Sequence, residues 1–451
     1  MRYPKTRLSL LMFIQFFIWG ATGPILSLYL RDCLGFSGAQ VGLILGLSAL
    51  GSIFSPAFMS FVADRFVSSE RLLCLLNAVG GACMFVFSRQ TGWYQALAIY
   101  IVYQVVVSPM SPLINAITFH HSPSERRKFG NIRVWGTVGW IAVAWFASFG
   151  LQQGGAAQAA AEGGSKLPLL LDISAITSFV MAAYCLTIPK RGRAHGPALT
   201  PDESPTPESI SVPTSAVSTP VSIPADELTP EPAPAPRPST RAALRVVLRP
   251  QVLALAAATA AITFVDKFYN VGTSPFLRSI GLSEQAVMPA MSLGQVPEIA
   301  AMGILGYLLT RFGAKRVLLL GVAMEIFRFA ACAAGFNMPL VYAALCVHGL
   351  AYTFTMVTAV ICLDGFCDAR ERSGVHQLFN VATAGIGGFL GSYAAGWTMD
   401  LFTDAAGSVN YRGYWAAPLA ISILVFITIA GKTGSPRISK AAPRLSSNDI
   451  K

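Results

Sequence analysis

The sequence predicts an all-α protein that crosses a membrane repeatedly, with twelve transmembrane helices in two six-helix bundles. Of its 451 residues, 53% are hydrophobic and only 12% are charged, whereas a soluble domain carries about 25% charged residues. Twelve mostly apolar stretches of roughly 17 to 26 residues are each long enough to span a bilayer core at ~1.5 Å per residue. One long polar segment in the middle of the chain separates them into two groups of six.

The twelve stretches follow one another with short polar connections. The predicted helices of the first group are 8–30, 39–62, 71–88, 93–117, 132–152 and 167–187. Those of the second group are 251–273, 287–309, 316–335, 339–363, 375–399 and 412–431. The first helix follows a short basic start, but its apolar stretch is too long for a signal peptide and no small-residue cleavage site follows. We therefore expect it to be retained.

The polar segment predicts the domain organisation. Residues 201–240 are rich in Pro, Ser and Thr and nearly free of aromatic residues, so they cannot bury enough apolar surface to fold. The sequence thus predicts an N-terminal bundle over 1–190, a disordered linker over 191–248, a C-terminal bundle over 249–433 and a tail over 434–451.

The net charge of +11 is unevenly distributed along the chain. If the N-terminus is inside, 25 of the 33 Lys and Arg residues fall in inner loops and termini, 5 in outer loops and 3 within helices. This is the positive-inside pattern of a membrane protein, and it argues against nucleic acid as the partner of the basic residues. It predicts an integral plasma membrane protein, in a bacterium the inner membrane, with both termini in the cytoplasm.

The two halves carry similar turns at corresponding places. Asp64 and Arg65 follow the second predicted helix, and Thr310 and Arg311 follow the eighth. Repeated halves around a central site are typical of transporters. Glycines in GxxxG spacing, Gly42/Gly46 on the second helix and Gly387/Gly391 on the eleventh, predict that these two helices approach closely across the halves, with packing against lipid as the alternative.

The Asp64–Arg65 turn resembles the loop between helices two and three of the major facilitator superfamily. More narrowly, the chain is similar to the nucleoside:proton symporter family of that superfamily. The matching patches are "QFFIWG" (15–20), "IRVWGTVGW" (132–140), "GQVPE" (294–298), "RFGAKRVLLLG" (311–321), "RFAACAAG" (328–335) and "GIGGFLG" (385–391). The resemblance implies the major facilitator fold and a conformational-gating role for Asp64, Arg65 and Arg311. It also implies that helix five packs against helix eight between the halves.

Polar residues on those two helices are candidates for the site. Arg133, Thr137 and Trp140 are spaced i, i+4, i+7, so that one face presents a cation, a hydroxyl and an aromatic ring. Gln295 and Glu298 share a face of predicted helix eight. A charged side chain in the middle of a membrane-spanning helix should face a cavity rather than lipid. The alternatives are that Arg133 anchors the inner interface and that Glu298 belongs to a structural ion pair.

Helices seven, nine and ten add further candidates. Asp266 and Asn270 share a face at i, i+4 beside Lys267, and His348 and Tyr352 lie on helix ten. The resemblance implies a nucleoside site formed by helices five, seven, eight and ten. Three positions depart from the family: Lys267 replaces an amide, His348 an aromatic hydroxyl and Thr353 an acid. Glu325 and Arg328 on helix nine are expected to form a structural pair.

Taken together, the sequence predicts a carrier that imports nucleosides by proton symport with alternating access. The expected substrate-binding residues are Arg133, Thr137, Trp140, Lys267, Asn270, Gln295, Glu298, His348 and Tyr352. The expected proton-coupling residues are Glu298, Arg133 and Asp266. A proton-coupled importer of mono- or disaccharides is the main alternative, because aromatic rings and a carboxylate also bind sugars. A sensor that binds without transport is the alternative of another class.

We expect no enzymatic activity, no metal and no cofactor. The paired histidines in "HHSPSER" lack the acid of an acyltransferase motif, and no Walker sequence is present. The expected partners are a small-molecule substrate, protons and membrane lipids, with no nucleic acid, and the expected state is a monomer.

Overall fold

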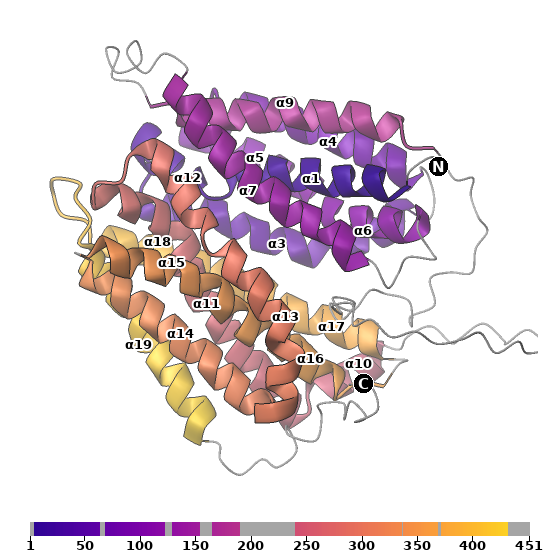
Figure 1. Ribbon diagram of the computed structural model, residues 1–451, viewed down its shortest axis with the longest axis vertical. Helices are drawn as coiled ribbons and strands as arrows, with labels where there is room; N and C mark the ends of the chain where they lie inside the picture. The colour runs from indigo at the N-terminus through magenta and orange to yellow at the C-terminus, as the bar shows by residue number, and fades with distance from the viewer. Residues whose placement is uncertain are drawn as a thin grey trace, which may run out of the picture.

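The computed structural model describes residues 4–63, 68–121, 129–153, 165–189, 240–335, 337–368 and 371–431. Nearly all of these residues lie in helices and short turns, as predicted (Figure 1). The helices of residues 4–189 form one half of the molecule and those of residues 240–431 the other, shown in purple and in orange to yellow in Figure 1. The protein is therefore an all-α polytopic membrane protein.

The N-terminal half contains eight α-helices and one π-helical turn among the described residues. They are α1 (Pro4–Thr22), α2 (Leu26–Leu28), a π-helical turn (Tyr29–Cys33), α3 (Gly38–Ala63), α4 (Ser69–Phe87), α5 (Trp93–Val107), α6 (Met110–His121), α7 (Phe129–Gln153) and α9 (Leu167–Leu186). The core of this half lies where α1 packs against α7 and α9 and where α4 packs against α9.

The C-terminal half begins with a short helix and ends with a long one. Its elements are α10 (Thr240–Val247), α11 (Pro250–Ser279), α12 (Glu284–Ser292), α13 (Gln295–Phe312), α14 (Ala314–Ala334), α15 (Met338–Tyr352), a π-helical turn (Thr353–Val357), α16 (Thr358–Asp364), α17 (Arg372–Asn380), a second π-helical turn (Val381–Gly387), α18 (Gly388–Leu401) and α19 (Tyr411–Gly431). Within it α14 packs against α15 and α19, and α11 packs against α18.

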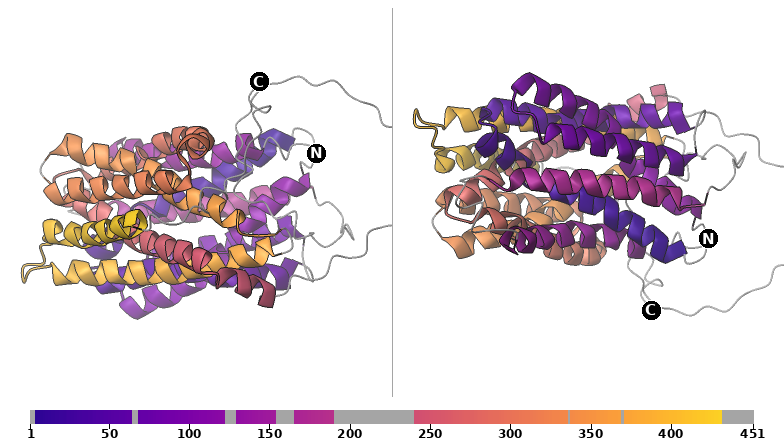
Figure 2. Two further views of the ribbon diagram at one scale, coloured as in Figure 1. Left: turned by 90° about the horizontal axis from the view of Figure 1, so that it is seen from below. Right: turned by 90° about the horizontal axis from the view of Figure 1, so that it is seen from above.

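Ten helical segments of the described chain are long and apolar enough to cross a membrane. The two remaining predicted spans are helical as well: α3 covers the second, and α17, the second π-helical turn and α18 run continuously through the eleventh. The helices run lengthwise side by side (Figure 2). We call the end where α1 begins, together with α10 and α17, the near side, and the opposite end, with the turns 280–283 and 402–410, the far side (Figures 1 and 2).

Several predicted helices are interrupted where proline or glycine occurs. Proline lacks an N–H and clashes with the preceding turn, and glycine lowers helix propensity. The first span breaks at Gly23 and Pro24, and the fourth breaks at Ser108 and Pro109. The eighth breaks just before Gly294, so that Glu298 lies in the first turn of a new helix, α13. Backbone N–H groups at a helix start favour negative charge there.

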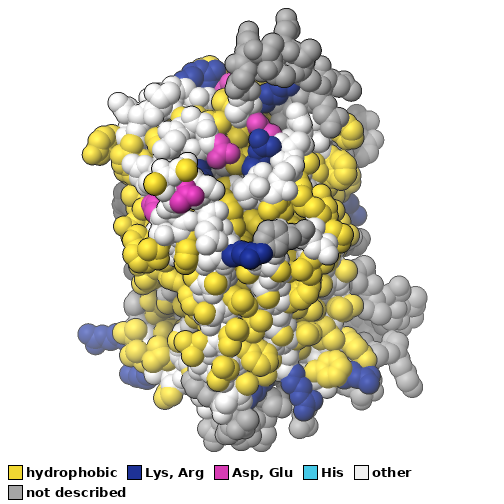
Figure 3. All heavy atoms as spheres, turned by 90° about the vertical axis from the view of Figure 1, so that its left-hand side faces the viewer, with side chains coloured by type: hydrophobic (Ala, Val, Ile, Leu, Met, Phe, Trp, Pro, Cys, Tyr) yellow, Lys and Arg dark blue, Asp and Glu magenta, His cyan; other side chains and the backbone are white. Residues whose placement is uncertain are grey.

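Hydrogen bonds join the two halves at the far side. The N–H groups of Gly38 and Ala39, at the start of α3, donate to the two carboxylate oxygens of Asp400 on α18 at 2.5 and 2.7 Å. Further hydrogen bonds join Ser27 to Val271, Arg31 to Gly407, and Ser165 and Lys166 to Glu284. On the surface of this side, acidic and basic side chains lie among apolar ones (Figure 3).

The predicted close contacts between helices two and eleven are confirmed for the glycines of helix two, but not for those of helix eleven. A Cβ at Gly42 would meet the carbonyl of Ser392 on α18, and one at Gly46 would stand 3.0 Å from Phe389. The glycines predicted on helix eleven point elsewhere, because Gly387 and Gly391 pack against α11 of their own half. The partner of α3 is instead Gly396, whose Cβ would overlap Gly38.

The prediction of a disordered linker is wrong at the C-terminal end of the predicted range. Residues 190–239 lie outside the described residues, but α10 occupies 240–247, inside the range 191–248 predicted as disordered. Ala243 and Val246, three residues apart and therefore on one face, are 3% and 2% exposed and join the core that contains Val375 of α17. This short helix has an apolar face that packs into the core of its half, so its residues fold.

Candidate functional site

The centre of the C-terminal half contains a cluster of charged side chains. Arg328 of α14 is fully buried, and it donates a hydrogen bond from Nη2 to Glu325, one turn earlier on the same helix. The same nitrogen lies 3.5 Å from Oδ1 of Asp266 on α11. The structural pair predicted for Glu325 and Arg328 is therefore confirmed, and it extends to a third charged residue that the sequence did not connect with it.

Asp266 also accepts a hydrogen bond from a residue of its own helix. Nδ2 of Asn270 donates to Oδ2 of Asp266 at 3.2 Å, which confirms that the two share a face at i, i+4. Lys267 points in another direction, and a Cβ at Gly388 of α18 would stand 3.3 Å from its Cε. The two oxygens of Asp266 are thus occupied by Arg328 and Asn270, and no ion pair joins them to Lys267 in the described structure.

His348 of α15 completes this cluster. Its ring stacks on the ring of Tyr269, with centroids 4.1 Å apart and planes inclined by 17°. Its Nδ1 is hydrogen-bonded to Nη1 of Arg328, and Oδ1 of Asp266 lies 3.8 Å from the same nitrogen. The guanidinium of Arg328 also lies over the Tyr269 ring, 4.5 Å from its centre, where the ring quadrupole attracts a cation.

A close helix contact places Glu298 beside this cluster. Gly349 follows His348, and a Cβ there would overlap the carbonyl oxygen of Gly294 and stand 2.7 Å from Cβ of Glu298. Only a residue without a side chain lets α15 and α13 approach so closely. The contact therefore holds α15, the helix of His348, against α13 at Glu298, within the same half.

The opposite half contributes the predicted face of α7. Cζ of Arg133 lies 4.1 Å from the centre of the Phe16 ring of α1. Arg133 and Glu298 interact electrostatically, and Tyr352 lies within reach of both. No ion pair of 4.0 Å or less joins these two described residues. Tyr352 is 42% exposed and directly precedes a π-helical turn, an element that often occurs at functional sites.

Trp140 and Thr137 are both half-buried on this face. The Trp140 ring lies against Gly20 of α1 and Gly23 of the turn that follows it: a Cβ at Gly20 would stand 3.3 Å from its Cδ2, and one at Gly23 would stand 3.0 Å from its Cη2. Trp140 therefore has a packing role, and its role in stacking on substrate stays a prediction. Gln295, in the first turn of α13, is half-buried beside Glu298.

The predicted gating residues are only partly visible. Asp64 and Arg65 lie outside the described residues. Arg311 is exposed at the end of α13, where its Nη1 donates to the hydroxyl of Tyr307 at 2.7 Å. It forms no ion pair within the described chain, so its role in gating stays a prediction.

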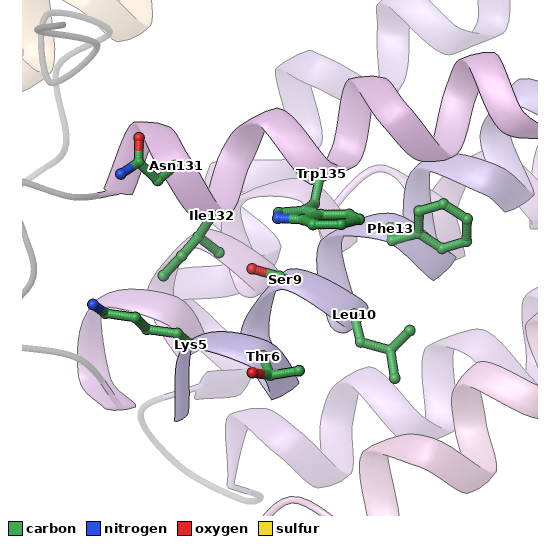
Figure 4. A pocket seen from close by; sticks show the side chains of 8 residues that line it. All are labelled: Lys5, Thr6, Ser9, Leu10, Phe13, Asn131, Ile132 and Trp135. Carbon is green, nitrogen blue, oxygen red and sulfur yellow. The ribbon is translucent and has the colours of Figure 1, made fainter. Parts of the chain in front are cut away.

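A cavity of about 530 Å³ lies between α1 and α7 toward the near side (Figure 4). Its lining residues are Lys5, Thr6, Ser9, Leu10, Phe13, Asn131, Ile132 and Trp135. None of the predicted site residues is among them. Leu10 and Trp135 are 42% and 48% exposed, and the lining is mostly apolar, unlike the polar cluster around Glu298.

Sequence reasoning missed three members of the cluster: Arg328 and Glu325 as neighbours of Asp266 and His348, and Tyr269 as the stacking partner of His348. Charged residues inside an otherwise apolar helix such as α14 face the protein interior rather than lipid. That signal was available for Arg328. The direction in which its side chain extends depends on how α14 packs against α15, and the sequence alone does not give that packing.

The chain resembles known proteins over most of its length. A family model described as "MFS_1 like family" matches residues 5–406. The "Putative nucleoside transporter YegT" of Escherichia coli (strain K12) is 27% identical over 93% of this chain and 92% of its own length. The "Xanthosine permease" of the same organism is 24% identical over 91% of each chain.

A solved structure shows the same fold. The crystal structure of the nucleoside transporter NupG superposes with a TM-score of 0.77, at 20% sequence identity, and the match covers 95% of this chain and 98% of that one. The two-bundle arrangement predicted from the sequence is therefore confirmed.

Proposed function

Because the chain belongs to the MFS_1 like family, we propose that it imports nucleosides by proton symport with alternating access. The observation that carries the proposal is the contact of Gly349 with Gly294 and Glu298. It holds the helix that carries Glu298 against the helix that carries His348 and Tyr352, and Glu298 lies within electrostatic reach of Arg133 of the other half. The relatives named as nucleoside and xanthosine carriers, which match over nine-tenths of the chain, support this substrate class.

In this proposal the substrate binds between the two halves, around Glu298. A ribose offers adjacent hydroxyls, which Glu298 accepts from and to which Gln295 donates. The base offers a flat face, and the exposed ring of Tyr352 is free to stack on it. Arg133, Thr137 and Trp140 complete the site from α7. Asn270 and Lys267 border it on α11, and His348 borders it on α15.

Glu298 carries the coupled proton in this proposal. A carboxylate isolated in a protein interior binds a proton more readily than one beside a guanidinium, because the positive charge stabilises the ionised form. Arg133 and Glu298 are on opposite halves, so a rocking motion changes their separation. Glu298 is then protonated when the halves hold Arg133 away and loses the proton when Arg133 approaches. Asp266 is the second candidate, although Arg328 and Asn270 already occupy its oxygens.

The near side is the cytoplasmic side in this proposal. The excess of Lys and Arg in the loops of that side supports cytoplasmic termini in a bacterial inner membrane. Since hydrogen bonds join the halves at the far side, the structure corresponds to the state that releases substrate inward. Asp64, Arg65 and Arg311 gate the opposite transition, and the carrier works as a monomer.

Uptake of labelled uridine tests the proposal. Proteoliposomes with an imposed proton gradient should accumulate uridine, and unlabelled nucleosides should compete while maltose and melibiose should not. Competition by the sugars alone would identify a sugar carrier. Saturable uridine binding without counterflow of labelled for unlabelled substrate would identify a sensor.

A further inference from the structure

We propose that Arg328 fixes His348 as the neutral imidazole protonated on Nε2, so that His348 presents a hydrogen-bond donor to an oxygen acceptor of the substrate. Arg328 is then a positioning residue, and His348 reads one acceptor atom of the transported molecule. The statement about the substrate rests on the proposed import of nucleosides. The statement about the imidazole does not.

The direction of the bond between the two side chains follows from their chemistry. A guanidinium has five N–H donors, has no acceptor and does not lose its proton in proteins. Nη1 of Arg328 bonds to Nδ1 of His348, so Nδ1 must accept. An imidazole that accepts through Nδ1 carries its single proton on Nε2.

The charges around His348 favour this form. The charged groups around His348 are Arg328 and Glu325 on α14 and Asp266 and Lys267 on α11, and Glu298 of α13 packs against α15 at the next residue, Gly349. Oδ1 of Asp266 lies 3.8 Å from Nδ1, beyond hydrogen-bond distance. A protonated His348 would therefore face the guanidinium of Arg328 with a second cation and lack an acceptor for Nδ1–H.

Neither partner is free to turn away. Arg328 is 0% exposed, and its other terminal nitrogen is bonded to Glu325 and near Asp266. The imidazole is stacked on Tyr269, and Gly349 locks its backbone against α13. The arrangement thus resists the ring flip that would exchange the two nitrogens.

Nε2 is the atom left for a ligand. It has no hydrogen-bond partner among the described residues, and it is not one of the enclosed polar atoms. The His348 side chain keeps 17% of its surface exposed. Gly349, the next residue of α15, packs against Glu298, so a substrate held by both side chains would offer an acceptor to His348 and a hydroxyl donor to Glu298.

Nitrogen NMR of the imidazole tests the first statement without any substrate. The full-length protein is labelled at its five histidines, and the His348 signals are assigned by their loss in His348→Phe. We expect Nδ1 to show the shift of an unprotonated nitrogen and Nε2 that of a protonated one. In Glu325→Gln/Arg328→Met, which removes one charge of each sign and keeps the net charge of the cluster, this preference should disappear. Protonation of Nδ1 in the wild type, or an unchanged spectrum in the double variant, would overturn the proposal.

Equilibrium binding tests the second statement. The ligands are uridine, its 2′-, 3′- and 5′-deoxy forms, and 2-thio- and 4-thiouridine, in which sulfur replaces a base carbonyl oxygen as a weaker acceptor. His348→Phe keeps the ring stack and removes the donor. It should weaken uridine binding about 5- to 10-fold, as for one neutral hydrogen bond. His348→Gln, whose amide nitrogen is as many bonds from Cα as Nε2, should restore most of it.

One ligand of the panel should bind equally to the wild type and to His348→Phe, and that ligand identifies the acceptor as a ribose hydroxyl or a base carbonyl. An equal loss for every ligand, or no loss for uridine, would overturn the proposal. If the wild type binds no nucleoside, the proposed function fails, while the NMR result still decides the state of His348.

Discussion

Gly349→Ala tests whether the contact between α15 and α13 holds the site together. The added Cβ would stand 2.7 Å from Cβ and 3.0 Å from N of Glu298, and closer still to the carbonyl oxygen of Gly294. An ordinary contact needs at least 3.4 Å, so α13 must move by about 0.7 Å at Glu298 and farther at Gly294. All the opposing atoms belong to the backbone or to a Cβ, so no flexible side chain can yield. Overpacking of this kind costs about 1–3 kcal/mol.

We expect uridine uptake by Gly349→Ala, normalised to protein inserted in the membrane, to fall about tenfold or more, since 1.4 kcal/mol corresponds to a factor of ten. Gly303→Ala on α13 is the matched control, because a Cβ there meets nothing within 4 Å. It should transport like the wild type. Equal uptake by the two variants would refute the inference that this contact positions Glu298 and His348.

Three further predictions follow from other parts of the chain. Trp140→Ala should weaken nucleoside binding about tenfold, from ~1–3 kcal/mol of lost base stacking, and Trp140→Phe should retain most of it; unchanged affinity would leave Trp140 only its packing against Gly20. Deleting 201–235 should leave expression and uptake within about twofold, and lost uptake with normal insertion would give the segment a role beyond tethering. Asp400→Ala removes both acceptors at the start of α3, worth ~1–2 kcal/mol, and should raise the labelling rate of Cys33 by an impermeant thiol reagent from the far side. An unchanged rate would show that Asp400 does not hold that side closed.

The helices and their grouping could be predicted because length and hydropathy are local properties of the sequence. Spacing along one helix was equally informative: the pairs Asp266–Asn270 and Glu325–Arg328 are hydrogen-bonded as their i, i+4 and i, i+3 separations predict. The break before Gly294 was not predicted, because the apolar run continues through it and hides the start of α13.

Contacts between helices were harder to predict, because they depend on rotation and approach. Arg328 was expected to pair only with Glu325, yet it also reaches Asp266 and His348 from α14. Gly38 and Gly42 of α3 meet helix eleven at Gly396, and Gly46 meets it at Phe389, rather than at the GxxxG pair. A small-residue pattern thus shows that a close approach occurs, but it does not identify the partner.

The central claim is that Glu298 carries the proton that accompanies the nucleoside. Its most direct test is the proton flux that uridine induces in proteoliposomes of the wild type and of Glu298→Gln, which mimics the protonated carboxyl and cannot release a proton. We predict that uridine drives proton entry in the wild type. In Glu298→Gln it should drive none, while exchange of labelled for unlabelled uridine continues. Proton entry at the wild-type ratio to uridine in Glu298→Gln would contradict the account and leave Asp266 as the remaining candidate.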